Sequence, residues 1–270
     1  MVDHFGKLNG GTVPLELHYN WQPSNILNDP FRTDRGHGCL VLNREIKIPP
    51  HVVRALWENA SLRCCVDGGA NRWLHFLTSE INQEYSLKLP DLITGDFDSI
   101  TAETTDYFAK RDIKQMHTPD QNHTDFSKAV DIIKPLLTKQ KLQDIVVFHD
   151  TSGRFDQIMA NVNTLFTRYD ERCRIFLLGS CALSWLLKPG KHSISIPSHL
   201  VKDKRWCSLI PVGHEATNVT TSGLKWNLNN GSLRFGGMVS SSNTYSCTEV
   251  EIETNSELVW SMGVFSFNDD

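Results

Sequence analysis

The chain has 270 residues, of which 40% are hydrophobic and 21% are charged, and its net charge is −4. This length suffices for one large domain or two ordinary ones, and the composition is typical of a globular protein. The weakly acidic charge offers no basic surface for nucleic acid, so we expect no nucleic-acid partner. No apolar run approaches the roughly 18 residues of a membrane-spanning helix, so we expect no membrane association.

The cysteines indicate a cellular compartment. There are seven, none forms a C-x-x-C pair, and most lie in apolar runs such as RCCV. Buried, reduced thiols are typical of intracellular proteins. The first thirty residues also lack the basic-then-apolar pattern of a secretory signal. We therefore expect a soluble cytoplasmic protein.

The pattern along the chain predicts an extension followed by two domains. Residues 1–37 are polar and interrupted by Gly and Pro, which predicts an N-terminal extension with a short strand at VPLELHY. Residues 38–188 alternate between short apolar runs and helical patterns. We expect strands at 38–43, 63–67, 92–94, 144–149 and 174–179. We expect helices at 50–60, 71–77, 101–110, 125–138 and 156–168.

This alternation predicts an α/β fold for residues 38–188, with a mostly parallel sheet and flanking helices, as in Rossmann-like nucleotide-binding domains. After Pro189-Gly190 the segments become short and alternating, and Gly, Asn and Ser separate them. That pattern predicts an antiparallel, all-β sandwich or roll over residues 189–270. The domain boundary is expected near residues 188–192.

Parallel sheets bind ligands at the carboxyl ends of their strands, and the first polar group there is Asp67-Gly68-Gly69, directly after RCCV. The glycines allow close approach of the backbone to a ligand, and amides at the next helix N-terminus can face phosphate. An ordinary turn explains the same residues equally simply.

Asp96 and Asp98 follow the predicted strand 92–94. Two carboxylates at i and i+2 on a loop can converge on one hard cation, and Mg²⁺ commonly takes one or two carboxylates together with phosphate oxygens. The alternative is capping of the helix expected from residue 101. Capping accounts for one of the two acids only.

The third polar group precedes the helix at 125–138. Thr124 suits an N-cap, and Asp125 is favoured in the first helical turn. Asp125 and Lys128 share a helix face, so they form either a salt bridge or a joint metal and phosphate site.

The fourth group follows the strand at 144–149. Gly153 frees the loop, Arg154 offers donors suited to phosphate oxygens, and Asp156 begins the next helix. A helix cap beside a surface arginine is the alternative.

Together, the four groups predict a polyphosphate site on one edge of the sheet, with Mg²⁺ and positive side chains around it. Neither G-x-x-x-x-G-K-[ST] nor a complete G-x-G-x-x-G is present. A P-loop enzyme and a conventional NAD site are therefore not expected.

In this order, the motifs DGGANR, GDFDS, DQNHTDFSK and SGRFDQ resemble those of thiamine pyrophosphokinase in its animal-like form. The stretches SLIPVG, VTTSGLKWNL and LRFGGMVSSSNTY look like the β domain of that family, and the resemblance covers residues 38–266. It implies transfer of the diphosphate of ATP to the hydroxyl of thiamine, which gives thiamine diphosphate and AMP.

The resemblance also implies roles for individual residues. The family's magnesium-binding acids match Asp96, Asp98 and Asp125. Asp67 matches an acid lining the same site, beside Gly68. Asn122 stands where related sequences often have an acid, so no further metal ligand is expected there.

Other matched positions would contact the substrates. Arg154 and Asp156 match residues that contact the nucleotide or its phosphates, and Lys128 would help to neutralise phosphate charge. Gln121 and Thr124 match residues at the substrate cleft.

The family works as a homodimer with shared active sites. On that pattern Trp226 would stack on thiamine bound to the neighbouring subunit, and Ser242 would reach the same site. Without the resemblance, Trp226 is simply a core aromatic, because it alternates with Leu224 and Leu228.

The implied reaction is direct in-line attack of the thiamine hydroxyl on the β-phosphorus of ATP. Asp98 is a candidate to accept the hydroxyl proton, Asp125 would act through the metal, and Arg154 would offset charge on the leaving group.

Two other functions remain open. D-F-D also occurs in metal-dependent nucleotide-sugar glycosyltransferases, and a non-catalytic nucleotide-binding sensor would bind ATP without releasing AMP.

Overall fold

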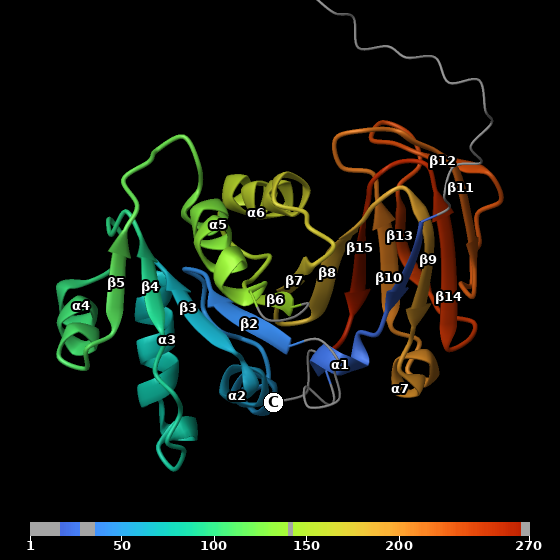
Figure 1. Cartoon of the computed structure of the whole chain (residues 1–270). Helices are drawn as coiled ribbons and strands as arrows, with labels where there is room; N and C mark the ends of the chain where they lie inside the picture. The colour runs from blue at the N-terminus through green and yellow to red at the C-terminus, as the bar shows by residue number, and fades with distance from the viewer. Residues whose placement is uncertain (1–16, 28–35, 140–142, 266–270) are drawn as a thin grey trace, which may run out of the picture.

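The computed structural model describes residues 17–27, 36–139 and 143–265. Its larger sheet has ten strands in the order β13-β10-β15-β8-β7-β6-β2-β3-β4-β5 (Figure 1). Six neighbouring strands pair in parallel, which confirms the mostly parallel sheet expected for residues 38–188. These are β2 (Gly36–Val41), β3 (Leu62–Val66), β4 (Leu92–Gly95), β5 (Lys114–His117), β6 (Gln143–Phe148) and β7 (Cys173–Leu178).

The other four strands of this sheet pair antiparallel, and β7 joins them through β8. They are β8 (Ala182–Leu187), β15 (Leu258–Gly263), β10 (Trp206–Ile210) and β13 (Ser240–Thr244). A smaller sheet lies beside them, in the order β1-β9-β14-β11-β12 (Figure 1). It consists of β1 (His18–Trp21), β9 (Gly190–Ser195), β14 (Glu249–Thr254), β11 (Ala216–Ser222) and β12 (Gly231–Leu233).

Helices cover both faces of the parallel strands, because successive strand residues point to opposite sides and both sides are apolar. In β2, Cys39 packs in one buried cluster and Leu40 in another. The first cluster includes α2 (Pro50–Asn59), α3 (Gly69–Thr78) and α4 (Ala102–Ala109), and the second includes α5 (Asp125–Leu137) and α6 (Phe155–Thr167). The five predicted helices are thus confirmed. Three shorter helices complete the described chain: α1 (Ser24–Leu27), the 3₁₀ turn Glu80–Asn82 and α7 (Ser198–Lys202).

The N-terminal segment contributes a strand to the smaller sheet. Part of the strand expected at VPLELHY lies outside the described residues, and the described part continues as β1, parallel to β9. Trp21 is buried, and its Nε1 donates to Nδ1 of His192 at 3.1 Å. The end of the predicted extension therefore belongs to the fold.

Two further observations concern the whole described chain. No described helix is long and apolar enough to cross a membrane. All seven cysteines are free, and five of them are buried.

Candidate functional site

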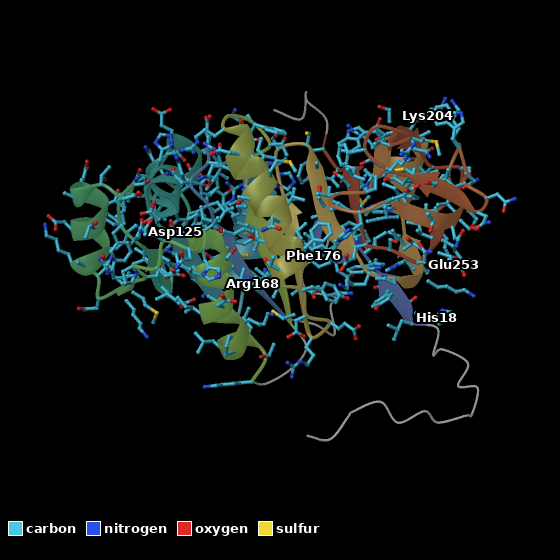
Figure 2. All side chains as sticks on the ribbon, turned by 90° about the horizontal axis from the view of Figure 1, so that it is seen from above. His18, Asp125, Arg168, Phe176, Lys204 and Glu253 are labelled. Atoms are coloured by element: carbon cyan, nitrogen blue, oxygen red, sulfur yellow. The ribbon has the colours of Figure 1, made fainter. Side chains whose placement is uncertain are left out.

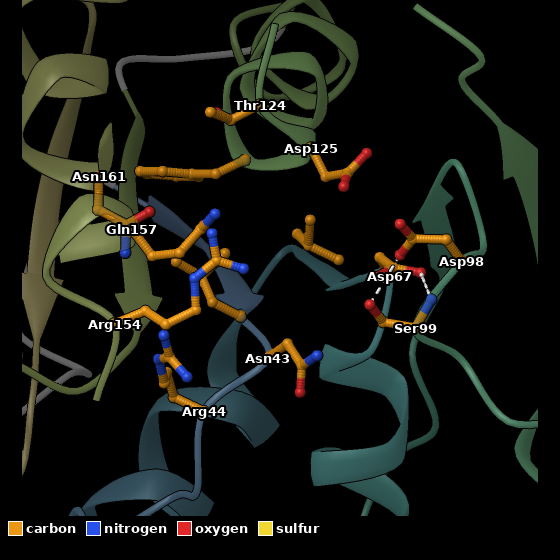
Figure 3. A pocket seen from close by; sticks show the side chains of 13 residues that line it. Asn43, Arg44, Asp67, Asp98, Ser99, Thr124, Asp125, Arg154, Gln157 and Asn161 are labelled. Atoms are coloured by element: carbon orange, nitrogen blue, oxygen red, sulfur yellow. Dashed lines mark hydrogen bonds between the residues drawn. The ribbon is translucent and has the colours of Figure 1, made fainter. Parts of the chain in front are cut away.

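A cavity of about 290 Å³ lies at the carboxyl edge of the parallel strands (Figure 3). Because these strands run in the same direction, the loops that follow them meet at one edge, beside the N-termini of α5 and α6. The lining residues are Leu42, Asn43 and Arg44 after β2; Val66 and Asp67 at the end of β3; Asp98 and Ser99 after β4; Thr124, Asp125 and Phe126; and Arg154, Gln157 and Asn161.

Three carboxylates meet at this edge. Asp67, Asp96 and Asp125 each offer an oxygen, and these oxygens all lie within 4.8 Å of one another. A set of carboxylate oxygens suits a hard divalent cation. Of the three acids expected to bind metal, Asp96 and Asp125 thus lie together, and Asp67 joins them. Asp98 lies beside this group on the cavity wall, where its Oδ1 accepts a bond of 2.7 Å from Ser99 Oγ.

A close contact between the ends of β3 and β4 positions Asp67. Its N–H donates to the carbonyl of Thr94 at 2.8 Å, and its backbone has a φ of 47°. A Cβ on Gly95 would lie only 2.6 Å from the Cβ of Asp67. Glycine at position 95 therefore allows the two acidic loops to approach closely.

The environment shifts the pKa values of two of these carboxyl groups in opposite directions. Burial raises the pKa of Asp67, and the nearby charge of Asp125 adds to this effect. A hydrogen bond of 3.0 Å from Gln121 Nε2 lowers the pKa of Asp96, and the charge of Lys128 contributes. The expected site residue Gln121 thus contacts the acidic group directly.

Lys128 is buried, and its ammonium group is fully engaged. Nζ lies 2.8 Å from Oδ1 of Asp125 and donates to the carbonyls of Thr118 and Asp120, each at 2.8 Å. An ammonium has three donors, so these contacts use all of them. The salt-bridge alternative describes this geometry, and Lys128 fixes Asp125; its contact with phosphate stays a prediction.

Thr124 and Gly68, which were also expected at the site, lie at this edge of the sheet. Thr124 is the N-cap of α5, and its side chain accepts from the N–H of Ser127 at 3.2 Å, which aims the start of the helix at the cavity. Gly68 precedes α3, and a Cβ there would lie 2.3 Å from the amide nitrogen of Asn43. Gly68 therefore makes room for a side chain of the cavity wall.

The opposite wall carries positive charge. Figure 3 shows Arg44 and Arg154 on one side of the cavity, and Asp67, Asp98 and Asp125 on the other. Arg154 donates to Asp156 through Nε and Nη2, and both side chains are exposed. This pairing lowers the pKa of Asp156 and raises that of Arg154. The cavity is thus acidic at one wall and basic at the other.

Sequence reasoning gave no functional role to five polar lining residues: Asn43, Arg44, Ser99, Gln157 and Asn161. Asn43 and Arg44 follow β2 as the other polar loops follow their strands, so the same rule applied to LNR would have found them. Gln157 and Asn161 are four residues apart, which places them on one face of α6.

Trp226 and Ser242 do not line this cavity. Trp226 is 57% exposed, and the Nζ of Lys225 lies 4.3 Å from its ring centre. Its backbone N–H donates to Oδ1 of Asn243, the neighbour of Ser242 in β13. Figure 2 shows the half that contains Asp125 at one side, while Lys204 and Glu253 mark the β half at the other. Within one chain, the predicted thiamine-stacking residue and the acids are therefore separated.

Comparison with known proteins gives a consistent result. Residues 53–177 match the family model "Thiamin pyrophosphokinase, catalytic domain", and residues 191–259 match "Thiamin pyrophosphokinase, vitamin B1 binding domain". Thiamine pyrophosphokinase 1 of Arabidopsis thaliana is 33% identical over 87% of this chain and 89% of its own length. Thiamine pyrophosphokinase 2 of the same plant is 35% identical, over 84% and 86%.

A solved structure shares the fold. The thiamin pyrophosphokinase from Candida albicans superposes with a TM-score of 0.77 at 24% identity, over 92% of this chain and 93% of that one. The sequence matches confirm the resemblance, and the animal-like form stays a prediction. The chain belongs to the thiamine pyrophosphokinase family.

Proposed function

We propose that the cavity binds ATP with a divalent metal and is where the diphosphate of ATP passes to the hydroxyl of thiamine. As a member of its family, the chain is an ATP-dependent thiamine diphosphokinase, which forms thiamine diphosphate and AMP. One observation supports this location above all: acids on one wall of the cavity face two guanidinium groups on the other, at the sheet edge. The acids on the wall are Asp67, Asp98 and Asp125, and Asp96 joins Asp67 and Asp125 in the oxygen cluster. A polyphosphate with its metal ion needs both kinds of charge.

The metal in this proposal is Mg²⁺, held by Asp67, Asp96 and Asp125. Their carboxylate oxygens match the hard ligands that this ion prefers, and a cluster of three acids without a cation would repel itself. When bound, the ion neutralises phosphate charge and fixes the orientation of the phosphates. Asp98, on the adjoining wall, remains a proposed metal ligand as well.

The residues of the chain would then act by positioning and by charge. Gln121 and Lys128 hold Asp96 and Asp125, while Arg154 binds phosphate oxygens. Asp156 orients Arg154. The thiamine oxygen bonds to the β-phosphorus as the bond from that phosphorus to the α–β bridging oxygen breaks, and AMP leaves with the electron pair. Asp98 would take the hydroxyl proton, and Thr124 and Gly68 shape the phosphate-facing backbone.

We propose further that thiamine binds between two copies of the chain. Trp226 is 57% exposed, so its ring is free to stack on an aromatic substrate. At the cavity, Phe155 follows Arg154 and is 73% exposed, and Met159 lies one turn further on α6. Apolar groups exposed at both places are typical of surfaces that are covered on association. Ser242 of one copy would accompany Trp226 at the site of the other.

The finer description of the fold belongs to the same proposal. Residues 38–188 would serve as a Rossmann-like unit for ATP, and residues 189–270 as a sandwich for thiamine and for dimer contacts. Seven free cysteines support a reducing, cytoplasmic location.

The direct test is incubation of the protein with ATP, Mg²⁺ and thiamine, followed by separation of the nucleotides and thiamine esters. We expect AMP and thiamine diphosphate in equal amounts, and neither product without thiamine. ATP binding without AMP would indicate a sensor, and release of nucleoside diphosphate from a nucleotide sugar would indicate a glycosyltransferase. Either result would refute the proposal.

Mixing two inactive variants tests the shared site. Asp125→Asn and Trp226→Ala should each be inactive at low thiamine. After dissociation and reassociation of a 1:1 mixture, a twofold dimer with random pairing would have about a quarter of its sites with both native residues. Recovery of about a quarter of native activity is the expected result. No recovery in a mixture shown to exchange subunits would place Asp125 and Trp226 of each site on one chain.

A further inference from the structure

Arg44 is a positively charged residue of the cavity wall, and the function proposed above gives it no role. It follows β2 and is half-buried, and its side chain lines the cavity opposite the acids (Figure 3). Over the described ranges, no carboxylate or carbonyl bonds to its guanidinium, whereas Arg154 pairs with Asp156 and Arg63 with Asp91. A half-buried guanidinium has five donors to satisfy, so Arg44 is suited to an anion entering from the cavity.

The position of Arg44 is defined by the loop that carries Arg154. Gly153 has a φ of +88°, and a Cβ there would lie 3.4 Å from the guanidinium carbon of Arg44. The guanidinium therefore packs against the turn that leads into Arg154. Two arginines from separate strand ends thus present their charges to the same part of the cavity.

We propose that Arg44 binds the α-phosphate of ATP and stabilises the AMP that leaves. This rests on the proposed function. In that reaction, negative charge grows on the oxygen between the α- and β-phosphorus as their bond breaks, and it stays with AMP. A fixed guanidinium across the cavity from the acidic group is placed to stabilise this charge, and its planar fork suits two phosphate oxygens.

The test replaces the guanidinium and measures AMP binding without turnover. Arg44→Gln removes the charge, and Arg111→Gln makes the same change in the turn after α4, where Arg111 stacks on Tyr107. Calorimetry with AMP should show affinity lowered about tenfold or more in Arg44→Gln, the size expected for a charge-assisted bond, and native affinity in Arg111→Gln. Arg44→Lys should recover part of the loss.

Steady-state kinetics give a second readout. In Arg44→Gln we expect kcat to fall and the KM for ATP to rise, while the KM for thiamine stays native. Native AMP affinity together with native kcat would overturn the proposal. An equal loss in Arg111→Gln, or equal effects on both substrates, would overturn it as well, because these results indicate a general structural defect.

Two outcomes separate this inference from the function on which it rests. If the native protein forms no thiamine diphosphate, the proposed function fails. If the native protein is active but Arg44→Gln binds AMP normally, the inference about Arg44 alone fails. Thermal unfolding checks the fold of each variant, and if Arg44→Gln unfolds, the folded Arg44→Lys variant decides: native AMP affinity and kcat there refute the need for a planar fork.

Discussion

Replacement of Gly95 by alanine should impair metal binding by Asp67, Asp96 and Asp125, although it changes none of these carboxylate side chains. The new Cβ would lie 2.6 Å from Cβ, 3.0 Å from Cα and 3.2 Å from N of Asp67. Ordinary contacts begin near 3.4 Å, so the ends of β3 and β4 must part by about 0.8 Å, and these are backbone-anchored atoms that cannot simply rotate away. This shift would move Asp67 away from Asp96 and Asp125.

The expected loss follows from the size of that shift. A misplacement of about 1 Å at a reacting centre can lower the rate about 100-fold. Overpacking should also lower the free energy of unfolding by about 1–3 kcal/mol. The assay measures AMP release against Mg²⁺ concentration, and we expect Gly95→Ala to need more Mg²⁺ and to keep a lower rate at saturation.

A second glycine separates loss of function from loss of stability. A Cβ on Gly38 would lie 2.8 Å from a terminal methyl of Leu137, which is the end of a flexible side chain in the core. Gly38→Ala should lose stability and keep the native Mg²⁺ requirement. A native Mg²⁺ requirement and rate in Gly95→Ala would refute the inferred role of the contact between Gly95 and Asp67.

Two further predictions concern charge. Asp125→Asn should keep the fold, because Lys128 retains two carbonyl partners. If Asp125 holds the metal, the rate of AMP release at saturating Mg²⁺ should fall by at least about 100-fold. Native turnover in this variant would contradict the prediction. Burial lowers the pKa of His192 to about 4, against 6.5 for an ordinary histidine, so only the unfolded chain binds this proton between those values. His192 alone should leave stability unaffected above pH 6.5 and lower the free energy of unfolding by about 3 kcal/mol as the pH decreases to 4. Urea unfolding across this range measures the loss, and His192→Asn should reduce its slope by one proton; an unchanged slope would exclude His192 as the source.

The hydrogen bond from Trp21 favours the same neutral form of His192 as burial does. An indole N–H can only donate, so Nδ1 of His192 must accept from Trp21. The proton then sits on Nε2, which lies 2.7 Å from the carbonyl of Lys188. A second proton would leave Trp21 Nε1 facing a donor. The neutral ring is therefore the form that joins β1 to β9.

The meeting of the acidic loops could be predicted because it depends on one rule: parallel strands end at one edge. Which acids share an oxygen cluster could not. Asp67 and Phe97 have positive φ values of 47° and 64°, and these turns decide where the carboxylates of Asp67, Asp96 and Asp98 point. Spacing in the sequence carries no sign of such backbone angles in residues other than glycine.

The two unpredicted strands of the larger sheet have different causes. β5 has the sequence KQMH and forms the edge of the sheet, so it lacks the apolar pattern of a buried strand. β8 is apolar, but it lies before the expected boundary at residues 188–192 and pairs with β15 beyond it. The domain limits stay a prediction, since β8 already pairs antiparallel with β7 before the sequence pattern changes, and the hydrogen bonding of the sheet continues across that change.

This continuity of the sheet bears on how the thiamine site is completed. Asn243 in β13 holds Trp226, and β13 and β5 are the two edges of the ten-stranded sheet. From β13 to β3, which ends at Asp67, there are seven strand spacings of ~4.8 Å, or roughly 35 Å along the sheet. A thiamine molecule is too small to span a path of that length, although the twist of the sheet makes the straight-line separation shorter than the path along it. This separation along the sheet supports the proposal that the acids and Trp226 at one thiamine come from different copies of the chain, and the mixing experiment with two inactive variants tests it.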